Sequence, residues 1–338
     1  MMMKALVMHG PGDARIDKVV EPSLKDEEVL LRVRRVGMCG SDLNTFRGKN
    51  PLVTYPRVLG HEVAATIEDP GKSGLNKGTH VTFSPYTSCG VCSSCRQCRH
   101  NACVNNQTMG VQRDGAMTEY VTVPVGKLYL AQLDLPELCL VEPLTVGTHA
   151  AARGRVGRED VVAVFGCGGV GLGAIAASAF RGATVIAIDV DEAKLETARQ
   201  AGAKYLVHSG RDDLHERLME WTDGRGPDVI IEAIGLPHTF RAAVEEVAFA
   251  GRVVYIGYAK EPVCYETRLF VQKELDIIGS RNALPEDFRE VIRMLEGGNF
   301  PVNQTITATV PLEGAPEILQ RWSESPSLFT KIVVNLDE

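Results

Sequence analysis

The sequence predicts an α/β protein in which a six-stranded parallel sheet is joined to a mostly β domain. From position 161 onward, short β-branched runs alternate with helical stretches, as in a parallel sheet covered by helices. Before position 145, short β-like runs are punctuated by Gly and Pro, which is typical of a β domain with irregular loops. With 338 residues, 44% of them hydrophobic, the chain is long enough for two domains with buried cores.

The strands expected in the parallel sheet span residues 161–165, 184–188, 205–208, 228–232, 252–257 and 275–279. Between them, helices are expected at 191–201 and 237–248, where Pro237 suits a first helical turn. Six strands complete a dinucleotide-binding fold. We therefore expect this domain to span residues 145–285.

The chain then continues with an expected helix at 285–295 and strands at 305–310 and 331–336. Because the parallel sheet is already complete, we assign residues 286–338 to the β domain, together with residues 1–144. In that first segment, residues 29–36 alternate in hydropathy like a strand.

Charge and hydropathy exclude several classes of function. The net charge of −7 and a pI near 5.7 argue against nucleic-acid binding, which needs a basic face. The apolar run at residues 5–8 is too short for a signal peptide, so we expect a cytoplasmic protein. Residues 161–180 carry no charge, but five glycines would each cost a lone helix about 1 kcal/mol relative to alanine. A strand, a turn and a helix explain this segment better than a membrane span.

Four cysteines stand at the spacing C-x2-C-x2-C-x7-C: Cys89, Cys92, Cys95 and Cys103. Short gaps let successive thiolates converge on one ion, and four sulfurs close a tetrahedral Zn²⁺ shell with no open position. This spacing predicts a structural zinc site that holds a loop. Disulfides or free thiols are the alternatives, and a reducing cytosol disfavours the disulfides. Cys98 lies inside the cluster, either as a bystander or as a substitute ligand.

A glycine-rich turn with the pattern G-x-G-x-x-G follows the strand at 161–165 and opens a helix; it contains Gly166, Gly168, Gly169, Val170 and Gly171. This context is typical of a turn that binds a pyrophosphate at a helix N-terminus. Asp189 ends the next strand, where a carboxylate binds both ribose hydroxyls; its negative charge would repel a 2′-phosphate, so NAD is expected rather than NADP. A turn or N-cap role for Asp189 is the alternative. Lys194 is either a further ribose or phosphate contact or an exposed lysine.

The motifs together resemble the zinc-dependent medium-chain dehydrogenases, the alcohol and polyol dehydrogenase superfamily, over the whole chain. In order, they are Gly37-x-Cys39-Gly-Ser-Asp42, Gly60-His61-Glu62, the four cysteines, Glu142-Pro143-Leu144 and the glycine-rich turn with Asp189. A glutamate followed by proline makes the chain similar to the sorbitol, threonine and sugar-acid branch. The resemblance implies a GroES-like β domain, two zinc ions per chain and a homodimer or homotetramer.

The resemblance also implies a catalytic zinc held by Cys39, His61 and Glu142, with one position open. Glu142 acts directly or through a water, and Glu62 is either a ligand or a group that orients one. Zinc eases the loss of a proton from an alcohol, and Ser41 is placed to accept the hydrogen bond of that alcohol and pass a proton outward. Asp42 is expected to orient His61 by a hydrogen bond. Without the metal, Cys39 would be a buried thiol and His61 a core histidine.

Polyols, sugar acids and related small hydroxy compounds are the substrates that the resemblance implies. Arg281 and Asn282, directly after the last expected strand, are candidate substrate residues, since an arginine there would bind a carboxylate. A surface or domain-linking role is the alternative for Arg281. Phe46 is a weaker candidate. A threonine-type amino alcohol dehydrogenase is a second hypothesis, and a catalytically silent NAD-binding or sensing protein is a third. Asn44 stands where many relatives carry a histidine that extends proton transfer to solvent.

Overall fold

The computed structural model describes residues 1–337, and the chain divides into two compact units. The first unit combines Met1–Glu142 with the segment from Val302 to the C-terminal end. The second is formed by Pro143–Pro301.

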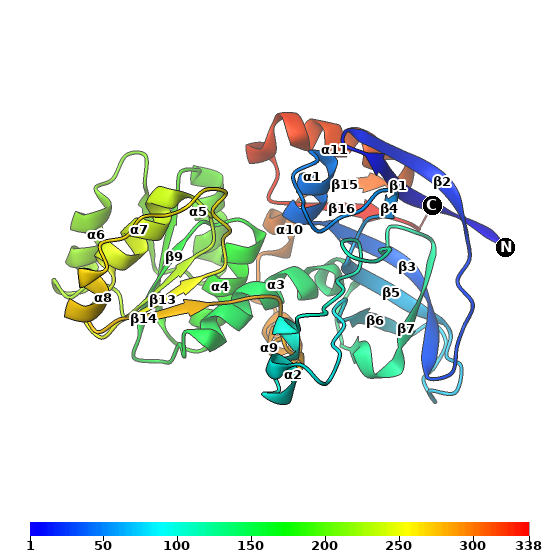
Figure 1. The fold of residues 1–338 in the computed structure, drawn as a ribbon, viewed down its shortest axis with the longest axis horizontal. Helices are drawn as coiled ribbons and strands as arrows, with labels where there is room; N and C mark the ends of the chain where they lie inside the picture. The colour runs from blue at the N-terminus through cyan, green and yellow to red at the C-terminus, as the bar shows by residue number, and fades with distance from the viewer. Residues whose placement is uncertain (338) are drawn as a thin grey trace. The chain divides into compact units, whose positions relative to one another are not determined.

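The second unit is built on a six-stranded sheet in the order β11-β10-β9-β12-β13-β14, in which every neighbouring pair is parallel (Figure 1). Each predicted strand is confirmed to within two residues at either end. Their bounds are β9 (Val161–Phe165), β10 (Thr184–Asp189), β11 (Tyr205–His208), β12 (Val229–Glu232), β13 (Arg252–Tyr255) and β14 (Asp276–Gly279).

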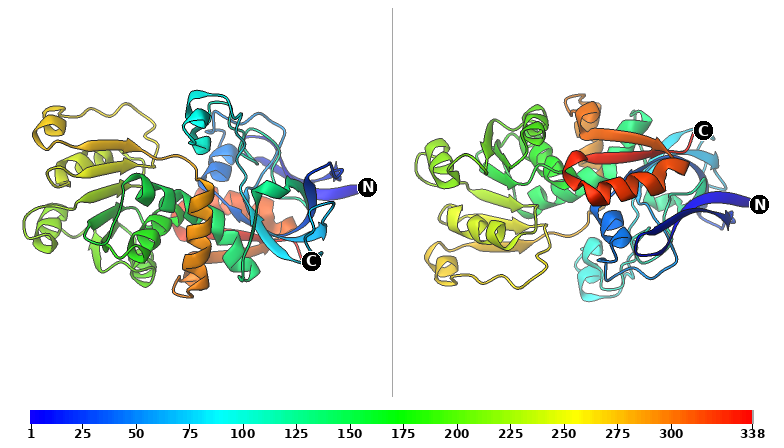
Figure 2. Two further views of the ribbon diagram at one scale, coloured as in Figure 1. Left: turned by 90° about the horizontal axis from the view of Figure 1, so that it is seen from below. Right: turned by 90° about the horizontal axis from the view of Figure 1, so that it is seen from above.

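Helices flank this sheet on both faces (Figure 2), as the alternation of strand and helix in the sequence predicts. Inside, β-branched and aromatic side chains of β9, β10, β12 and β13 form one buried core. The helices are α4 (Gly169–Phe180), α5 (Glu192–Gln200), α6 (Leu214–Trp221), α7 (Pro237–Glu246), α8 (Arg268–Gln272) and α9 (Pro285–Glu296). The helix α3 (Leu135–Arg153) carries the chain from the first unit into the second.

Residues 286–301, which the sequence analysis assigned to the β domain, lie in the second unit. Two side-chain contacts, one half-buried and one buried, hold α9 there. Arg181, directly after α4, donates from Nε and Nη2 to the two carboxylate oxygens of Glu290, at 2.7 and 2.8 Å. His149 of α3 and Asp287 of α9 lie 2.8 Å apart through Nδ1 and Oδ2. The second unit therefore does not end where its sheet is complete, because these two contacts bind α9 to the same unit.

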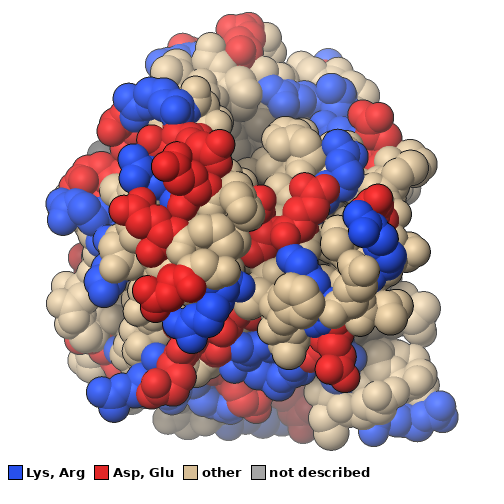
Figure 3. Space-filling model, turned by 90° about the vertical axis from the view of Figure 1, so that its left-hand side faces the viewer, with Lys and Arg blue, Asp and Glu red and all other residues tan. Residues whose placement is uncertain are grey.

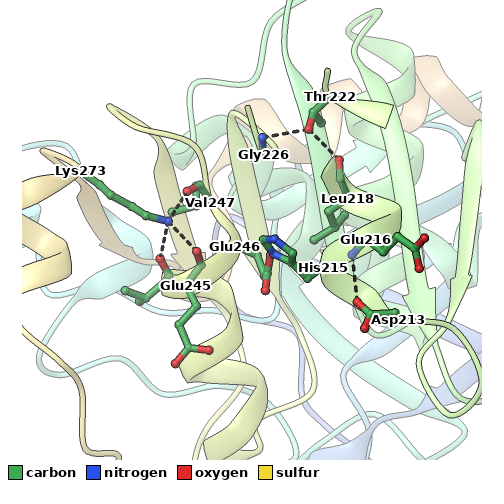
Figure 4. A network of polar contacts seen from close by, with 11 residues as sticks. Asp213, His215, Glu216, Leu218, Thr222, Gly226, Glu245, Glu246, Val247 and Lys273 are labelled. Carbon is green, nitrogen blue, oxygen red and sulfur yellow. Dashed lines mark hydrogen bonds and ion pairs between the residues drawn. The ribbon is translucent and has the colours of Figure 1, made fainter. Parts of the chain in front are cut away.

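Several helix ends in the second unit are satisfied by side chains (Figure 4). Lys273 donates from Nζ to the carbonyl oxygens of Glu245 and Val247, at 2.6 and 2.8 Å, at the C-terminus of α7. A cation at this position also complements the partial negative charge of the helix end. After α6, Thr222 Oγ1 donates to Leu218 O at 2.6 Å and accepts from Gly226 N at 2.9 Å.

The first unit is mostly β, as predicted. A small sheet has the order β2-β1-β4, and a seven-stranded sheet has the order β15-β16-β3-β5-β6-β8, with β7 paired to β3. The strands are β1 (Met2–Gly10), β2 (Asp13–Val20), β3 (Glu28–Met38), β4 (Arg57–Val58), β5 (Glu62–Asp69), β6 (His80–Phe83), β7 (Tyr120–Pro124), β8 (Leu128–Leu130), β15 (Ile306–Pro311) and β16 (Lys331–Asn335). The helices of this unit are α1 (Gly40–Phe46), α2 (Ser93–Arg96), α10 (Val302–Thr305) and α11 (Ala315–Glu324).

No helix within residues 1–337 combines the length and apolar character needed to cross a membrane. On the face in Figure 3, acidic and basic side chains are interspersed. Many charges of the second unit are paired, among them Arg199 with Glu196 on α5 and Arg217 with Glu220 on α6.

Candidate metal centre and nucleotide site

The antiparallel pairing of β3 with β5 brings the first metal-binding group together. Gly37 of β3 stands opposite Glu62 of β5. Cys39 comes shortly after Gly37 in the chain, and His61 comes directly before Glu62, so both lie at the same end of this strand pair. The side-chain donor atoms of Cys39, His61 and Glu62 all lie within 4.8 Å of one another. His61 is 5% exposed and Glu62 is 1% exposed. A thiolate, an imidazole and a carboxylate are the ligands that zinc takes in proteins.

The electrostatic environment of His61 also suits a cation. Burial opposes charge on its ring, but a hydrogen bond with Cys39 and the negative charges of Cys39, Glu142 and Asp42 raise the pKa of His61 well above its usual value. His61 Nδ1 is buried and has no hydrogen-bond partner within residues 1–337. The residues present therefore fit a zinc ion. A cation bound there would take the place of the proton that the surrounding negative charges favour on His61.

Only glycine fits at position 37. A Cβ atom there would lie 2.1 Å from Glu62 Oε2, which is far inside contact distance. The absence of a side chain at residue 37 is what lets the Glu62 carboxylate occupy the space between the two strands.

A buried lysine near the C-terminal end holds Glu62. Lys331 of β16 places Nζ 2.6 Å from both Oε1 and Oε2 of Glu62, and 3.2 Å from Met38 O. The Lys331 side chain is 6% exposed. Burial lowers the pKa of Lys331, yet the charges of Glu62 and Cys39 outweigh this effect and raise it, which favours the ammonium form of Lys331. Sequence reasoning missed Lys331, because nothing in the local sequence of β16 distinguishes it from an exposed lysine.

Glu142 approaches the same centre from α3. It is 3% exposed, and Oε1 accepts a short hydrogen bond from the hydroxyl of Tyr86, which is itself 6% exposed. Its carboxylate lies outside the group of Cys39, His61 and Glu62, although its charge acts on His61. Burial is the main cause that raises the pKa of Glu142. Tyr86 was also missed, since a tyrosine in an irregular segment carries no recognisable motif.

The helix α1 places Ser41 beside Cys39, which is the N-cap residue of this helix. Ser41 Oγ is buried and has no hydrogen-bond partner in the described chain, so it is available to a substrate hydroxyl. Asp42 Oδ2 accepts a hydrogen bond from Cys39 N at 2.8 Å. The expected bond from His61 to Asp42 is absent: His61 Nδ1 and Asp42 Oδ1 both lack partners among residues 1–337.

Phe46, a candidate substrate residue in the sequence, lies at the end of α1. It is 5% exposed and packs in the hydrophobic core of the first unit.

The four predicted cysteines form the second metal-binding group. The sulfur atoms of Cys89, Cys92, Cys95 and Cys103 lie within 4.8 Å of one another. All nine cysteines of the chain are free, so no disulfide competes with a metal here. A hydrogen bond with Ser94 is the first of several contacts that lower the pKa of Cys92 to about 5. Cys98 is exposed and lies outside the group.

The glycine-rich turn of the second unit has the tight geometry expected for a phosphate-binding loop. Gly166 has φ of +96°, and a Cβ atom on Gly171 would lie 1.8 Å from Gly166 O. Gly168 is the N-cap residue of α4, whose first residues are Gly169 and Val170. Only glycine fits at positions 166 and 171, so the backbone of this turn is free to approach a ligand closely.

Asp189 is tied to this turn. Its Oδ2 accepts from Cys167 N at 2.7 Å, and its Oδ1 accepts from Val190 N at 2.7 Å. Lys194 lies in the first turn of α5, which Asp191 caps. Arg281 is exposed and Asn282, with φ of +52°, is half-buried; both follow β14.

The sequence also matches two family models. Residues 25–133 match the alcohol dehydrogenase GroES-like domain, and residues 169–297 match the zinc-binding dehydrogenase domain. A zinc-type alcohol dehydrogenase-like protein of Haemophilus influenzae is 34% identical over 98% of both chains. The L-galactonate-5-dehydrogenase of Escherichia coli is 31% identical over 94% of this chain and 95% of the relative. The sorbitol dehydrogenase of Bacillus subtilis is 31% identical over 98% of this chain and 97% of the relative.

Solved structures of dehydrogenases resemble the fold of this chain. An alcohol dehydrogenase of E. coli CFT073 complexed with NADH has a TM-score of 0.90, 28% identity and 99% coverage of both chains. A zinc-binding dehydrogenase of Sinorhizobium meliloti bound to NADP has a TM-score of 0.92 and 27% identity, covering 99% of this chain and 100% of the other. The chain therefore belongs to the zinc-binding alcohol dehydrogenase family, and it is an alcohol or polyol dehydrogenase.

The Glu62–Lys331 pair gives a stability prediction. Lys331→Met leaves a buried carboxylate without its cation, which costs about 3–5 kcal/mol in the free energy of unfolding. Lys77→Met is the matched control, because Lys77 and Glu68 form an exposed pair worth about 1 kcal/mol or less. Urea denaturation of both zinc-loaded variants measures the difference. Equal losses in the two variants would contradict the prediction.

Zinc content tests the ligand role of the four cysteines. Cys95→Ser removes one sulfur from a closed four-sulfur group, so the variant should hold about one zinc per chain fewer than the parent protein. Cys98→Ser removes a neighbouring exposed thiol and should retain the full content. Elemental analysis after dialysis measures both. A loss of zinc in Cys98→Ser alone would show that the ligands are wrongly assigned.

Proposed function

We propose that this dehydrogenase oxidises a secondary alcohol of a small polyol or sugar acid with NAD as the hydride acceptor. The proposal is carried by the convergence of half-buried Cys39 with buried His61 and Glu62. It is also carried by the Ser41 hydroxyl, which is close to Cys39 in the chain and has no partner among residues 1–337. In the overall reaction, the alcohol loses a hydride to NAD⁺ and a proton to solvent, which gives a ketone and NADH.

Cys39, His61 and Glu142 are the proposed ligands of the catalytic zinc. Glu62 belongs to the same group of donor atoms and would reach an ion bound there, but both of its oxygens are held by Lys331. Glu142 is bound at Oε1 by the neutral hydroxyl of Tyr86, and its charge acts on His61. Zinc supplies Lewis acidity, which stabilises negative charge on a substrate oxygen and eases its deprotonation.

The other residues position the substrate and move its proton. Ser41 Oγ is buried and has room for a hydrogen bond, so it accepts the proton of the substrate hydroxyl as its own proton moves outward. Asn44 stands where many relatives carry a histidine, and its amide does not carry a proton by ionising. The exit of the proton is therefore proposed to involve water or a ribose hydroxyl.

The preference for NAD rests on Asp189. Its carboxylate ends β10 and is fixed by the amide of Cys167, within the glycine-rich turn that is proposed to hold the pyrophosphate through Gly166, Gly168, Gly169, Val170 and Gly171. Oδ2 has a second lone pair for a ribose hydroxyl, whereas Oδ1 already accepts from Val190 N and Asp191 N. A 2′-phosphate at the same place would meet a negative charge. Lys194 is a proposed additional contact with ribose or phosphate.

The substrate class is supported by the relatives, which include an L-galactonate-5-dehydrogenase and a sorbitol dehydrogenase at 31% identity. Arg281 and Asn282 are proposed substrate residues, and the guanidinium of Arg281 suits a carboxylate. A sugar acid would use that arginine, whereas a neutral polyol would not.

We also propose that the protein is a cytoplasmic homodimer or homotetramer. Its nine cysteines are all free, which suits a reducing compartment. The strand β14 stands at the end of the parallel sheet, and Ile277 on it is 42% exposed, so a second copy could extend the sheet there.

A substrate panel tests the function. NADH formation should be measured with aldonates, neutral polyols and L-threonine, each with NAD⁺ and zinc-loaded protein. We expect turnover on an aldonate or polyol, and Arg281→Ala should raise KM for aldonates more than for polyols. Turnover on L-threonine alone would replace the proposed substrate class, and no turnover on any alcohol would overturn the proposed function.

Asp189→Asn tests the choice of coenzyme. The amide keeps an oxygen that accepts from Cys167 N, but it removes the negative charge. We expect kcat/KM for NAD⁺ to fall about tenfold or more, because hydrogen bonds to a charged group contribute about 1.5–3 kcal/mol. We also expect the preference for NAD⁺ over NADP⁺ to become smaller. Asp191→Asn, which alters the N-cap of α5, is the control. An unchanged ratio of the two coenzymes would exclude Asp189 as the discriminating group.

A further inference from the structure

Tyr86 contacts a proposed ligand of the catalytic zinc and is close in sequence to the four-cysteine group. Its buried hydroxyl donates to Glu142 Oε1, and in the sequence it comes three residues before Cys89, the first cysteine of the four-sulfur group. The proposed catalytic ligand and the structural site are therefore connected through one side chain and one short segment.

The residues on either side of Tyr86 are tied to the segment that follows the last cysteine. Pro85 O accepts from Met109 N at 3.2 Å and from Arg113 Nη2 at 3.1 Å. Thr87 Oγ1 accepts from Gln107 N at 2.7 Å. The backbone at residue 86 is thus held on both sides by residues 107–113.

The four-cysteine group joins the same two segments. Cys89 N donates to Cys103 Sγ at 3.3 Å, and the sulfur atoms of Cys89 and Cys103 lie 3.6 Å apart. A metal bound by both sulfurs cross-links residues 85–89 to residues 103–113. Such a cross-link restricts the positions open to the segment that carries Tyr86.

We propose that Tyr86 is a positioning residue that transmits the order of the four-cysteine group to Glu142, so that structural zinc sets how tightly the catalytic zinc is held. The proposal rests on the proposed function in taking Glu142 as a ligand. Its physical basis is the phenol hydrogen bond, which fixes the carboxylate in one orientation. Partners of this kind typically change metal affinity by about 10–100-fold.

Zinc release to a chromogenic chelator tests the proposal without substrate or coenzyme. Tyr86→Phe keeps the buried ring and removes the hydroxyl. We expect its catalytic zinc to leave about tenfold faster or more, with release from the four-cysteine group unchanged. His61→Ala identifies the catalytic phase, because that phase is lost in this variant. Tyr55→Phe is the matched control, since the Tyr55 hydroxyl donates to Thr45 O at 2.6 Å in the same unit.

Two further measurements separate positioning from general stability. Cobalt loaded at the catalytic site should show altered visible absorption bands in Tyr86→Phe, because the orientation of one ligand changes. Thr87→Val removes the acceptor of Gln107 N and should also speed release of the catalytic zinc.

Release from the catalytic site at the parent rate in Tyr86→Phe, or equal acceleration at both sites, would overturn the proposal. Release at the parent rate in Thr87→Val would overturn the link to the four-cysteine group. Because no step depends on turnover, a protein that binds zinc but oxidises no tested alcohol would still give a result. Failure of the proposed function is thereby distinguished from failure of this inference.

Discussion

The buried ion pair between Glu62 and Lys331 is the constraint on which the first unit depends. It connects residues that are 269 positions apart and joins the last strand, β16, to the edge of the metal-binding group. The pairing of β16 with β3, and of β3 with β5, places the carboxylate and the ammonium side by side. Neither charge would be tolerated alone at this depth. The C-terminal segment is therefore part of the metal centre as well as of the sheet.

Much of the second unit could be predicted from the sequence, because its signals are local. Strands β9 and β10 are continuous β-branched runs. Gly166 is favoured by its own φ of +96°, and Gly171 is required by its close approach to Gly166 O in the same turn. The four cysteines were predictable for the same reason, since short gaps alone bring their sulfurs together. Local patterns of this kind identify the residues before any tertiary contact is known.

The residues that sequence reasoning missed depend on distant contacts. Lys331 and Tyr86 acquire their roles only when β16 meets β3 and when α3 brings Glu142 to the phenol. The helix α3 itself was not predicted, and Pro143 within it argues locally against a continuous helix. The extent of the second unit was misjudged because α9 is bound by the Arg181–Glu290 pair, which links residues 109 positions apart.

The anchoring of Asp189 to Cys167 N has a consequence for protein engineering. The carboxylate proposed to recognise the coenzyme also holds the backbone of the glycine-rich turn. Replacing it with a small or cationic residue, in order to accept a phosphorylated coenzyme, would release that turn at the same time. A redesign of this chain for the other coenzyme would thus have to rebuild the support of the loop together with its charge.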